Sequence, residues 1–324
     1  MVPLIYSSHY NITAFGIERL HPFDGAKYQR IHDWLIAQGI RRPADFTAPE
    51  ICSGRDLLRV HTPEYLEKLN HSAELAKVFE FGLLAYLPHQ FTDWRVLSPM
   101  RWATGGTILA ARLARERGFA INIGGGYHHA SAAHGHGFCV YADEPIALAT
   151  LHAEKPFRSA LVVDADVHQG DGTADAIRSW PWARMFDLYE QAIFPSRKAA
   201  EDYPVPLPSG LCGAEYLRVL QTELPKALDR FQPEFVMCNA GSDVLESDPL
   251  SSFQLTIDEM IDRDLFVVTQ VRERGIPLVM ALSGGYSPQS WAAHARSIEA
   301  LVTRFDRAHL AAELAPRGAS PAAK

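Results

Sequence analysis

Three side chains that can bind metal ions follow one short apolar segment at every second position. The segment is 160–163, and the three residues are Asp164, Asp166 and His168. Alternate residues of an extended chain point to one face, so both carboxylates and the imidazole share a side. Such a group is costly to bury unless a cation or another polar partner compensates it. The segment therefore predicts a strand that ends in a cation site. The alternative is a strand-to-turn segment whose aspartates cap a helix and whose histidine is exposed.

The composition is that of an ordinary globular protein without a dominant charge. Of the 324 residues, 47% are hydrophobic and 21% are charged, and the formal net charge is -7. Lys and Arg form no run and no basic arm, so we do not expect strong nucleic-acid binding. The four cysteines are widely separated and include no Cys-x-x-Cys pair, which disfavours a thiolate zinc site.

The N-terminal residues lack the basic and long apolar regions of a signal peptide. No apolar run reaches the ~20 residues that a membrane-spanning helix needs. We therefore expect a cytoplasmic protein without a membrane span.

Short apolar runs alternate with helical patterns, which is typical of a mainly parallel sheet with helices on both faces. The expected strands are 4–6, 119–123, 160–163, 183–188, 235–239 and 277–282. The expected helices are 24–38, 100–117, 214–231, 256–274 and 287–305. We predict one α/β domain, residues 1–312, because no linker composition divides the chain. Residues 313–324 are expected to form a disordered tail, since this end is rich in Ala, Pro, Gly and Ser.

Four of the expected strands lead into turns with reactive side chains, namely 124–129, 164–172, 240–243 and 283–286. The carboxyl ends of parallel strands meet at one edge of a sheet, where ligands bind. Taken singly, each turn has another explanation. The paired histidines His128 and His129 could be surface residues, Asp243 could cap a helix, and Tyr286 could be a packing aromatic. Together, the four turns predict one shared site.

The motifs in these turns resemble those of the zinc-dependent histone deacetylase superfamily. The matching motifs are His128-His129, Gly135-His136-Gly137-Phe138-Cys139, Asp164-x-Asp166-x-His168-x-Gly170-Asp171-Gly172, Ala240-Gly241-Ser242-Asp243 and Gly284-Gly285-Tyr286. The segments 10–13, 21–24 and 242–250 are most similar to the class IV branch. The resemblance extends over residues 5–305 and implies an arginase-deacetylase-like fold, with a parallel sheet of about eight strands flanked by helices.

The chain departs from many relatives at three positions. Gln169 stands where a second histidine is common, and Ser283 where the glycine run is often longer. Asp187 replaces a neutral hydroxyl residue. These changes leave every implied chemical role filled, and they bear on substrate and cation preference.

The resemblance implies an amidohydrolase that removes acetyl or longer fatty acyl groups from lysine side chains or related amines. Asp166, His168 and Asp243 would hold one Zn²⁺ per chain and leave room for water and a carbonyl. Metal-bound water would attack the amide carbonyl, with His129 as general base and then acid. His128 would act as an electrostatic partner.

The resemblance also supplies the groups around these residues. Asp164 would orient His128 and Asp171 would orient His129, while Tyr286 would stabilise the oxyanion. The substrate tunnel would be lined by Gly137, Phe138, Phe194 and Leu250. A monovalent cation, K⁺ or Na⁺, would be held by Asp164, Asp166, His168, Asp187 and Leu188.

Other functions stay open at this point. The substrate could be an acylated lysine peptide or a small acylated amine, as in an acetylpolyamine or metabolite deacetylase. An arginase-type ureohydrolase would need a second metal ion with further Asp and His ligands. A non-catalytic acyl-lysine binder would have no use for the complete set of catalytic side chains. The sequence leaves the oligomeric state open.

Overall fold

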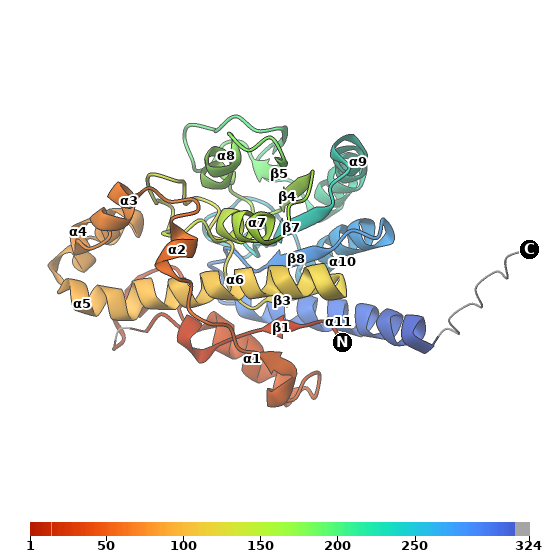
Figure 1. Cartoon of the computed structure of the whole chain (residues 1–324), viewed down its shortest axis with the longest axis horizontal. Coiled ribbons are helices and arrows are strands. Elements are labelled where there is room, and N and C mark those ends of the chain that lie inside the picture. The colour runs from red at the N-terminus through yellow and green to blue at the C-terminus, as the bar shows by residue number, and fades with distance from the viewer. Residues whose placement is uncertain (14, 315–324) are drawn as a thin grey trace, which may run out of the picture.

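The computed structural model describes residues 1–13 and 15–314, and in this part of the chain eight parallel strands form one sheet (Figure 1). The strand order is β2-β1-β3-β8-β7-β4-β5-β6. The strands are β1 (Leu4–Ile5), β2 (Phe46–Thr47), β3 (Phe119–Asn122), β4 (Ala160–Asp164), β5 (Ala183–Glu190), β6 (Tyr203–Leu207), β7 (Phe235–Asn239) and β8 (Leu278–Ala281). The predicted α/β class and parallel sheet are confirmed.

Helices cover both faces of the sheet. The longer ones are α1 (Lys27–Ala37), α6 (Ser98–Arg117), α7 (Asp143–Glu154), α9 (Gly213–Phe231), α10 (Ile257–Glu273) and α11 (Ser290–Leu314). The shorter ones are α2 (Gly54–Leu57), α3 (Pro63–Lys68), α4 (Ser72–Val78), α5 (His89–Thr92) and α8 (Asp171–Ile177). Helical segments of other types are Ser8–Tyr10, Ile17–Leu20, Pro43–Asp45, Gly82–Tyr86 and the π-helical Asp93–Leu97.

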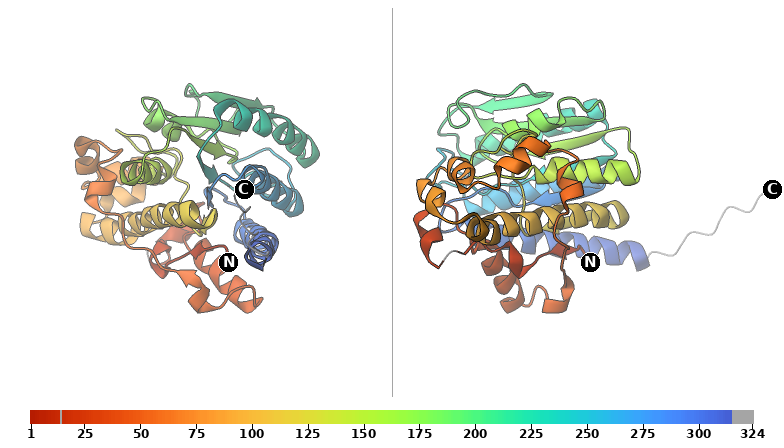
Figure 2. Two further views of the ribbon diagram at one scale, coloured as in Figure 1. Left: turned by 45° about the vertical axis from the view of Figure 1, so that its right-hand side comes forward. Right: turned by 60° about the vertical axis from the view of Figure 1, so that its left-hand side comes forward.

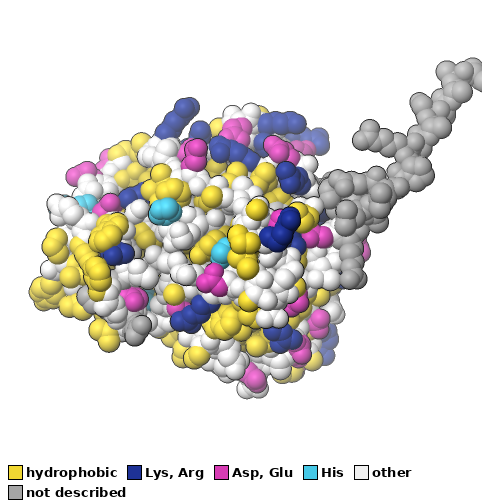
Figure 3. Space-filling model, turned by 90° about the horizontal axis from the view of Figure 1, so that it is seen from below, with side chains coloured by type: hydrophobic (Ala, Val, Ile, Leu, Met, Phe, Trp, Pro, Cys, Tyr) yellow, Lys and Arg dark blue, Asp and Glu magenta, His cyan; other side chains and the backbone are white. Residues whose placement is uncertain are grey.

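The helices form two layers. Helices α6 and α7 pack together on one face, while α9, α10 and α11 pack in succession on the other (Figure 2). Helix α1 packs against α11. The apolar core lies between the two helix layers and the sheet. Every residue of β3, β4, β7 and β8 is buried. On the surface shown in Figure 3, Lys and Arg side chains are interspersed with Asp, Glu and apolar side chains.

Local signals explain where several helices begin and end. Helix α6 ends at Gly118, which adopts a left-handed φ of 88°. Helix α10 begins with a capping box, in which Thr256 and Glu259 each accept a hydrogen bond from the other's backbone N–H. Helix α11 continues to Leu314, so residues 313 and 314 are helical, and the remainder of the expected tail, 315–324, lies outside the described residues.

Several elements were not among those expected from the sequence, namely strands β2 and β6, helix α7 and the short helices α2, α3, α4, α5 and α8. Strand β6 contains Pro204 and Pro206, which argue against a central strand, yet β6 lies at the sheet edge where a missing N–H donor is tolerated. Strand β2 is only two residues long. Helix α7 is buried on most of its surface, so its sequence lacks the polar face that marks an amphipathic helix.

The register of the sheet aligns the strand ends that carry the predicted motifs. Asp164 at the end of β4 pairs with Asn239 of β7 and Asp187 of β5. Asn239 in turn pairs with Ala281 of β8, and Ala281 with Asn122 of β3. Five adjacent strands therefore deliver their following loops to the same edge.

Candidate metal centre and active site

Asp166, His168 and Asp243 form a buried cluster at this edge, with donor atoms within 4.8 Å of one another. Nδ1 of His168 lies 3.2 Å from Oδ1 of Asp166 and 3.3 Å from Oδ2 of Asp243. Burial lowers the pKa of His168, but the nearby carboxylates of Asp166 and Asp243 raise it to about 9, so the cluster favours a positive charge. Oδ2 of Asp243 is buried and makes no hydrogen bond to the described residues. These observations fit a divalent cation such as zinc.

A buried arginine connects the two loops that carry this cluster. Nη1 of Arg263, from α10, donates to the carbonyls of Ala165 at 2.9 Å and Gly241 at 2.6 Å. Its charge is balanced by Asp264, 2.8 Å away. Sequence analysis missed Arg263 because an arginine within a helix carries no motif.

Glycine is required at two positions against the cluster. A Cβ on Gly241 or Gly284 would collide with the carboxylates of Asp166 and Asp243. The motifs Ala240-Gly241-Ser242-Asp243 and Gly284-Gly285-Tyr286 thus contain these glycines because the backbone there lies directly against the two carboxylates.

Two adjacent histidines lie beside the cluster and have opposite protonation preferences. Nδ1 of His128 is 2.9 Å from Asp164, and Nδ1 of His129 is 2.8 Å from Asp171. Burial opposes protonation of His128, but the charges of Asp164 and Asp166 raise its pKa to about 10. Burial and the adjacent His128 lower the pKa of His129 to about 3. Near neutral pH the pair therefore contains one imidazolium and one neutral imidazole, which separates an electrostatic role from a basic one.

Hydrogen bonds to an aspartate that sequence analysis missed hold the loop that carries these histidines. The carboxylate of Asp143, at the start of α7, accepts hydrogen bonds from the backbone N–H groups of Gly126 at 3.0 Å and Tyr127 at 2.8 Å. It also accepts one from the Thr107 hydroxyl at 2.6 Å. An acidic residue in the first turn of a helix is common, so its sequence context gave no indication of this contact.

Asp171 contacts a second histidine that had no assigned role. Nε2 of His136 lies 3.1 Å from Oδ2 of Asp171, while Oδ1 is engaged by His129. Burial opposes ionisation of Asp171, but the hydrogen bond from His129 and the proximity of His136 hold its pKa below the usual range. His136 stood inside the Gly135–Cys139 motif, yet nothing in the sequence indicated its contact with Asp171.

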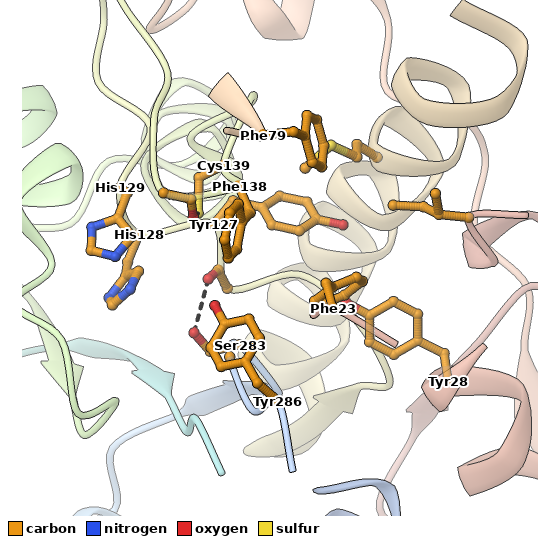
Figure 4. A pocket seen from close by; sticks show the side chains of 15 residues that line it. Phe23, Tyr28, Phe79, Tyr127, His128, His129, Phe138, Cys139, Ser283 and Tyr286 are labelled. Atoms are coloured by element: carbon orange, nitrogen blue, oxygen red, sulfur yellow. Dashed lines mark hydrogen bonds between the residues drawn. The ribbon is translucent and has the colours of Figure 1, made fainter. Parts of the chain in front are cut away.

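A pocket opens beside the histidines. Its lining includes the predicted residues His128, His129, Gly137, Phe138 and Tyr286. Figure 4 shows the two imidazoles side by side on one wall, with Phe138 and Tyr286 next to each other. The rings of Phe138 and Tyr286 meet edge to face, with centroids 5.7 Å apart. Burial raises the pKa of Tyr286, so its hydroxyl keeps its proton and can donate a hydrogen bond.

The pocket continues past the histidines into an apolar region lined by Ile12, Phe23, Tyr28, Phe79 and Met100. This region comes from segments before β3, which sequence analysis did not connect to the site. Figure 4 places Phe23, Tyr28 and Phe79 away from the imidazoles. The space therefore offers apolar walls beyond the polar groups.

Strained backbone and a buried lysine shape the wall of the pocket. Phe138 and Ser283 have φ angles of 66° and 53°, in the left-handed region that non-glycine residues rarely adopt. Nζ of Lys27, which is fully buried, donates to the carbonyls of Ser283 at 2.6 Å and Gly284 at 3.0 Å. Burial lowers the pKa of Lys27 to about 8. Sequence analysis placed Lys27 in the expected helix 24–38 but did not connect it to the site, because the family-like segment 21–24 ends before it.

A buried aspartate holds the backbone at Tyr286. Oδ2 of Asp248 accepts hydrogen bonds from the N–H groups of Tyr286 at 2.7 Å and Ser287 at 3.1 Å. Its Oδ1 accepts one from the N–H of Leu250 at 3.0 Å. Leu250 is 37% exposed and is not part of the pocket lining, although this contact ties it to the tyrosine loop.

Phe194 lies at the outer side of the histidine pair. Its ring centroid is 5.0 Å from that of His129, in an edge-to-face arrangement, and it is 38% exposed. A Cβ on Gly137 would come within 3.0 Å of the Phe194 ring. Phe194 therefore packs beside His129 and Gly137, but it is not among the residues that line the pocket.

The residues expected to hold a monovalent cation are also adjacent. Asp187 and Leu188 of β5 are fully buried beside β4. Asp187 accepts a hydrogen bond from the N–H of Gly170 at 2.8 Å through Oδ2, while its Oδ1 has no partner among the described residues. Burial and the charges of Glu201 and Asp164 raise the pKa of Asp187. An unpartnered buried oxygen in such a group fits a cation.

Comparison with known proteins agrees with this geometry. The histone deacetylase domain matches residues 21–302. The chain belongs to the histone deacetylase family. It is 41% identical over 303 residues to histone deacetylase 2 of Arabidopsis thaliana. The matched region covers 93% of this chain and 78% of that protein. An uncharacterised protein of Picosynechococcus is 32% identical over 313 residues, covering 96% of this chain and 98% of that one.

The fold comparison extends over the whole chain. The crystal structure of the HDA15 HD domain superposes with a TM-score of 0.74 at 20% identity, covering 99% of this chain and 91% of that one. The histone deacetylase fold is thereby confirmed, and family membership supports a deacetylase, that is, a hydrolase of amide bonds. The assignment to class IV stays a prediction. Among the described residues, no helix is long and apolar enough to cross a bilayer.

Proposed function

We propose that this histone deacetylase family member is a zinc-dependent deacylase that hydrolyses the amide bond of an acylated lysine side chain. One observation carries the proposal: the paired histidines His128 and His129 lie next to a buried Asp-His-Asp cluster, and Tyr286 lines the same pocket. We place the protein in the class IV branch and in the cytoplasm. Asp187 and its neighbours would hold K⁺ or Na⁺.

Asp166, His168 and Asp243 would hold the zinc ion, which when bound supplies Lewis acidity to a substrate carbonyl and to water. Two carboxylate ligands offset the charge of the ion, so a separate base is needed. His129 fills this role, because Asp171 fixes its Nδ1 and leaves Nε2 to accept a proton. The base takes a proton from the attacking water at Nε2 and returns it to the leaving amine.

The other two groups stabilise charge on the carbonyl oxygen. His128 is held as an imidazolium by Asp164 and Asp166 and supplies a positive charge beside the reacting centre. Tyr286 donates a hydrogen bond from a hydroxyl that burial keeps protonated. Gly137 and Phe138 line the path of the lysine stem, whose methylene groups gain from leaving water.

The apolar extension of the pocket supports acyl groups longer than acetyl. Phe23, Phe79 and Met100 line this extension, and none of these three side chains carries a charge. An acyl chain that passes the reacting carbonyl would reach these walls. Each methylene group that leaves water there contributes about 0.8 kcal/mol.

The test is a substrate panel for the zinc-loaded protein. Acetyl-, octanoyl- and myristoyl-lysine peptides are compared with acetylated polyamines, and release of the free amine is measured. We expect hydrolysis of lysine peptides, a kcat/KM that rises with acyl length, and loss of turnover on chelation with recovery on zinc addition. Turnover that survives complete metal removal would contradict the mechanism. Hydrolysis confined to polyamines would replace the proposed substrate.

A further inference from the structure

A second group of metal-binding side chains lies beside the proposed base, outside the Asp166, His168 and Asp243 cluster. It consists of His129, Asp171 and His136, whose donor atoms also lie within 4.8 Å of one another. Oδ1 of Asp171 is 2.8 Å from Nδ1 of His129, and Oδ2 is 3.1 Å from Nε2 of His136. This nitrogen of His136 is shielded from solvent and makes no hydrogen bond within the described part of the chain.

The distances and the ligand types suit a transition-metal ion. Ligands in a tetrahedral zinc site lie about 3.3 Å apart, given Zn–N and Zn–O distances near 2.0–2.1 Å. The contacts of 2.8 and 3.1 Å need only a small adjustment to reach this spacing, and the two imidazole donors lie within 4.8 Å of each other. Two imidazoles with one carboxylate favour Zn²⁺, Cu²⁺ or Ni²⁺, whereas Mg²⁺ and Ca²⁺ require mostly oxygen ligands.

The surroundings allow an ion to enter from solvent. The exposed fraction of the side chain rises from 4% at His129 to 14% at Asp171 and 27% at His136. The group is therefore buried on one side and open on the other, which leaves a position for a water ligand.

We propose that His129, Asp171 and His136 form a second, inhibitory site for a divalent transition-metal ion, and that zinc is the ion bound there in the cell. Binding depends on these three side chains alone. Inhibition rests in addition on the proposed function, because it acts through His129 as the base.

Inhibition follows from the two nitrogens of one imidazole. The ionised Asp171 accepts the hydrogen bond of Nδ1–H of His129, which leaves the lone pair at Nε2 free to accept a proton. An ion bound at Nδ1 takes the lone pair there, and the proton from Nδ1 is relocated to Nε2. The ring stays neutral, and no net proton is released from it. Because Nε2 then carries a hydrogen, His129 cannot take a proton from water.

The same loop provides a matched control. His134 is exposed, and its ring centroid is 5.4 Å from that of His136. It contacts Ser131 and is not part of the group of three ligands. His134→Ala removes an imidazole from this loop and keeps the proposed site, whereas His136→Ala removes a ligand. Thermal unfolding of both variants verifies that each is folded.

The experiment titrates the full chain, loaded with one equivalent of zinc, with further Zn²⁺. Isothermal titration calorimetry gives the number and affinity of additional ions, and hydrolysis of an acyl-lysine peptide is followed in parallel. We expect the wild type and His134→Ala to bind a second equivalent and to lose activity as it binds. In His136→Ala, the zinc concentration for half-inhibition should rise by more than about 100-fold. Loss of a direct ligand lowers metal affinity more than loss of a residue that only hydrogen-bonds to a ligand, which costs about 10–100-fold.

The outcomes separate the two proposals. A wild-type chain that binds only one equivalent overturns the second site, as does a second equivalent of unchanged affinity in His136→Ala. Equal loss in His134→Ala also overturns it, because the effect would then belong to the loop and not to the ligand set. If no acylated substrate is hydrolysed, the proposed function fails, while the calorimetric stoichiometry still decides whether the second site exists.

Discussion

Replacement of Tyr286 by phenylalanine removes one oxygen from the pocket and leaves the ring in place. The edge-to-face contact with Phe138, at 5.7 Å and 71°, involves only the ring and is retained. The backbone at this position stays bonded to Asp248 through the N–H of Tyr286. We therefore expect the free energy of unfolding to change by less than about 1 kcal/mol.

The expected kinetic effect is much larger than the effect on stability. Loss of one oxyanion donor costs about 10²–10³ in kcat, or about 2.7–4 kcal/mol of transition-state stabilisation. The hydroxyl contributes mainly when charge develops on the carbonyl oxygen, so kcat should fall by this factor while KM changes little. A pocket tyrosine with a raised pKa donates its proton throughout the neutral range, and the loss should therefore be constant between pH 6 and 9.

The assay is steady-state hydrolysis of an acyl-lysine peptide by zinc-loaded wild type and Tyr286→Phe, with metal content determined for each. Tyr203→Phe is the control, because Tyr203 lies on the outer strand β6, away from the pocket, and its hydroxyl donates to Glu223 of α9. A kcat of Tyr286→Phe within about tenfold of the wild type would refute the role of the hydroxyl. A matching loss of bound zinc would show that the variant acts through the metal centre instead.

Three further predictions concern the metal centre and the stability of the fold. Gly284→Ala places a methyl group against the carboxylate of Asp243, so zinc affinity should fall at least about tenfold; full zinc occupancy after dialysis would contradict this close approach. Arg263→Met leaves the buried Asp264 charge unpaired and should lower the free energy of unfolding by about 3–5 kcal/mol in urea titrations, and a loss below about 1 kcal/mol would argue against the pair. Burial lowers the pKa of His61 from 6.5 to about 4. The neutral form of His61 therefore stabilises the fold fully above pH 6.5. This contribution to the free energy of unfolding, roughly 3 kcal/mol, is lost as the pH falls toward 4. His61→Gln should flatten this acid-side decline, and an unaltered pH profile of stability would contradict the assignment.

The sequence contained the parts of the site that lie at strand ends. Asp164, Asp166 and His168 follow one apolar run at alternate positions, and the parallel sheet places Asp243 on a neighbouring strand end. Strand periodicity and the geometry of parallel sheets are local or general rules, so this convergence could be predicted before any coordinates. The pairing of His128 with Asp164 came from the family resemblance, and the structure brings the two within 2.9 Å.

The supporting contacts could not be predicted in this way. Lys27, Asp143 and Arg263 lie on helices and bond to backbone groups of loops that are distant in sequence. Each of these side chains is compatible with an ordinary helix, and its role depends on which loop packs against it. His136 is similar, because its contact with Asp171 depends on how the loop after His129 folds back.

The two prolines of β6 have a consequence for how copies of this protein meet. Pro204 and Pro206 alternate with the buried Val205 and Leu207 and are exposed along the outermost strand. Proline has no N–H to offer, so a strand from a second molecule finds half of the usual ladder missing there. The opposite border of the sheet is the two-residue strand β2. We therefore expect both borders to disfavour edge-to-edge pairing between molecules.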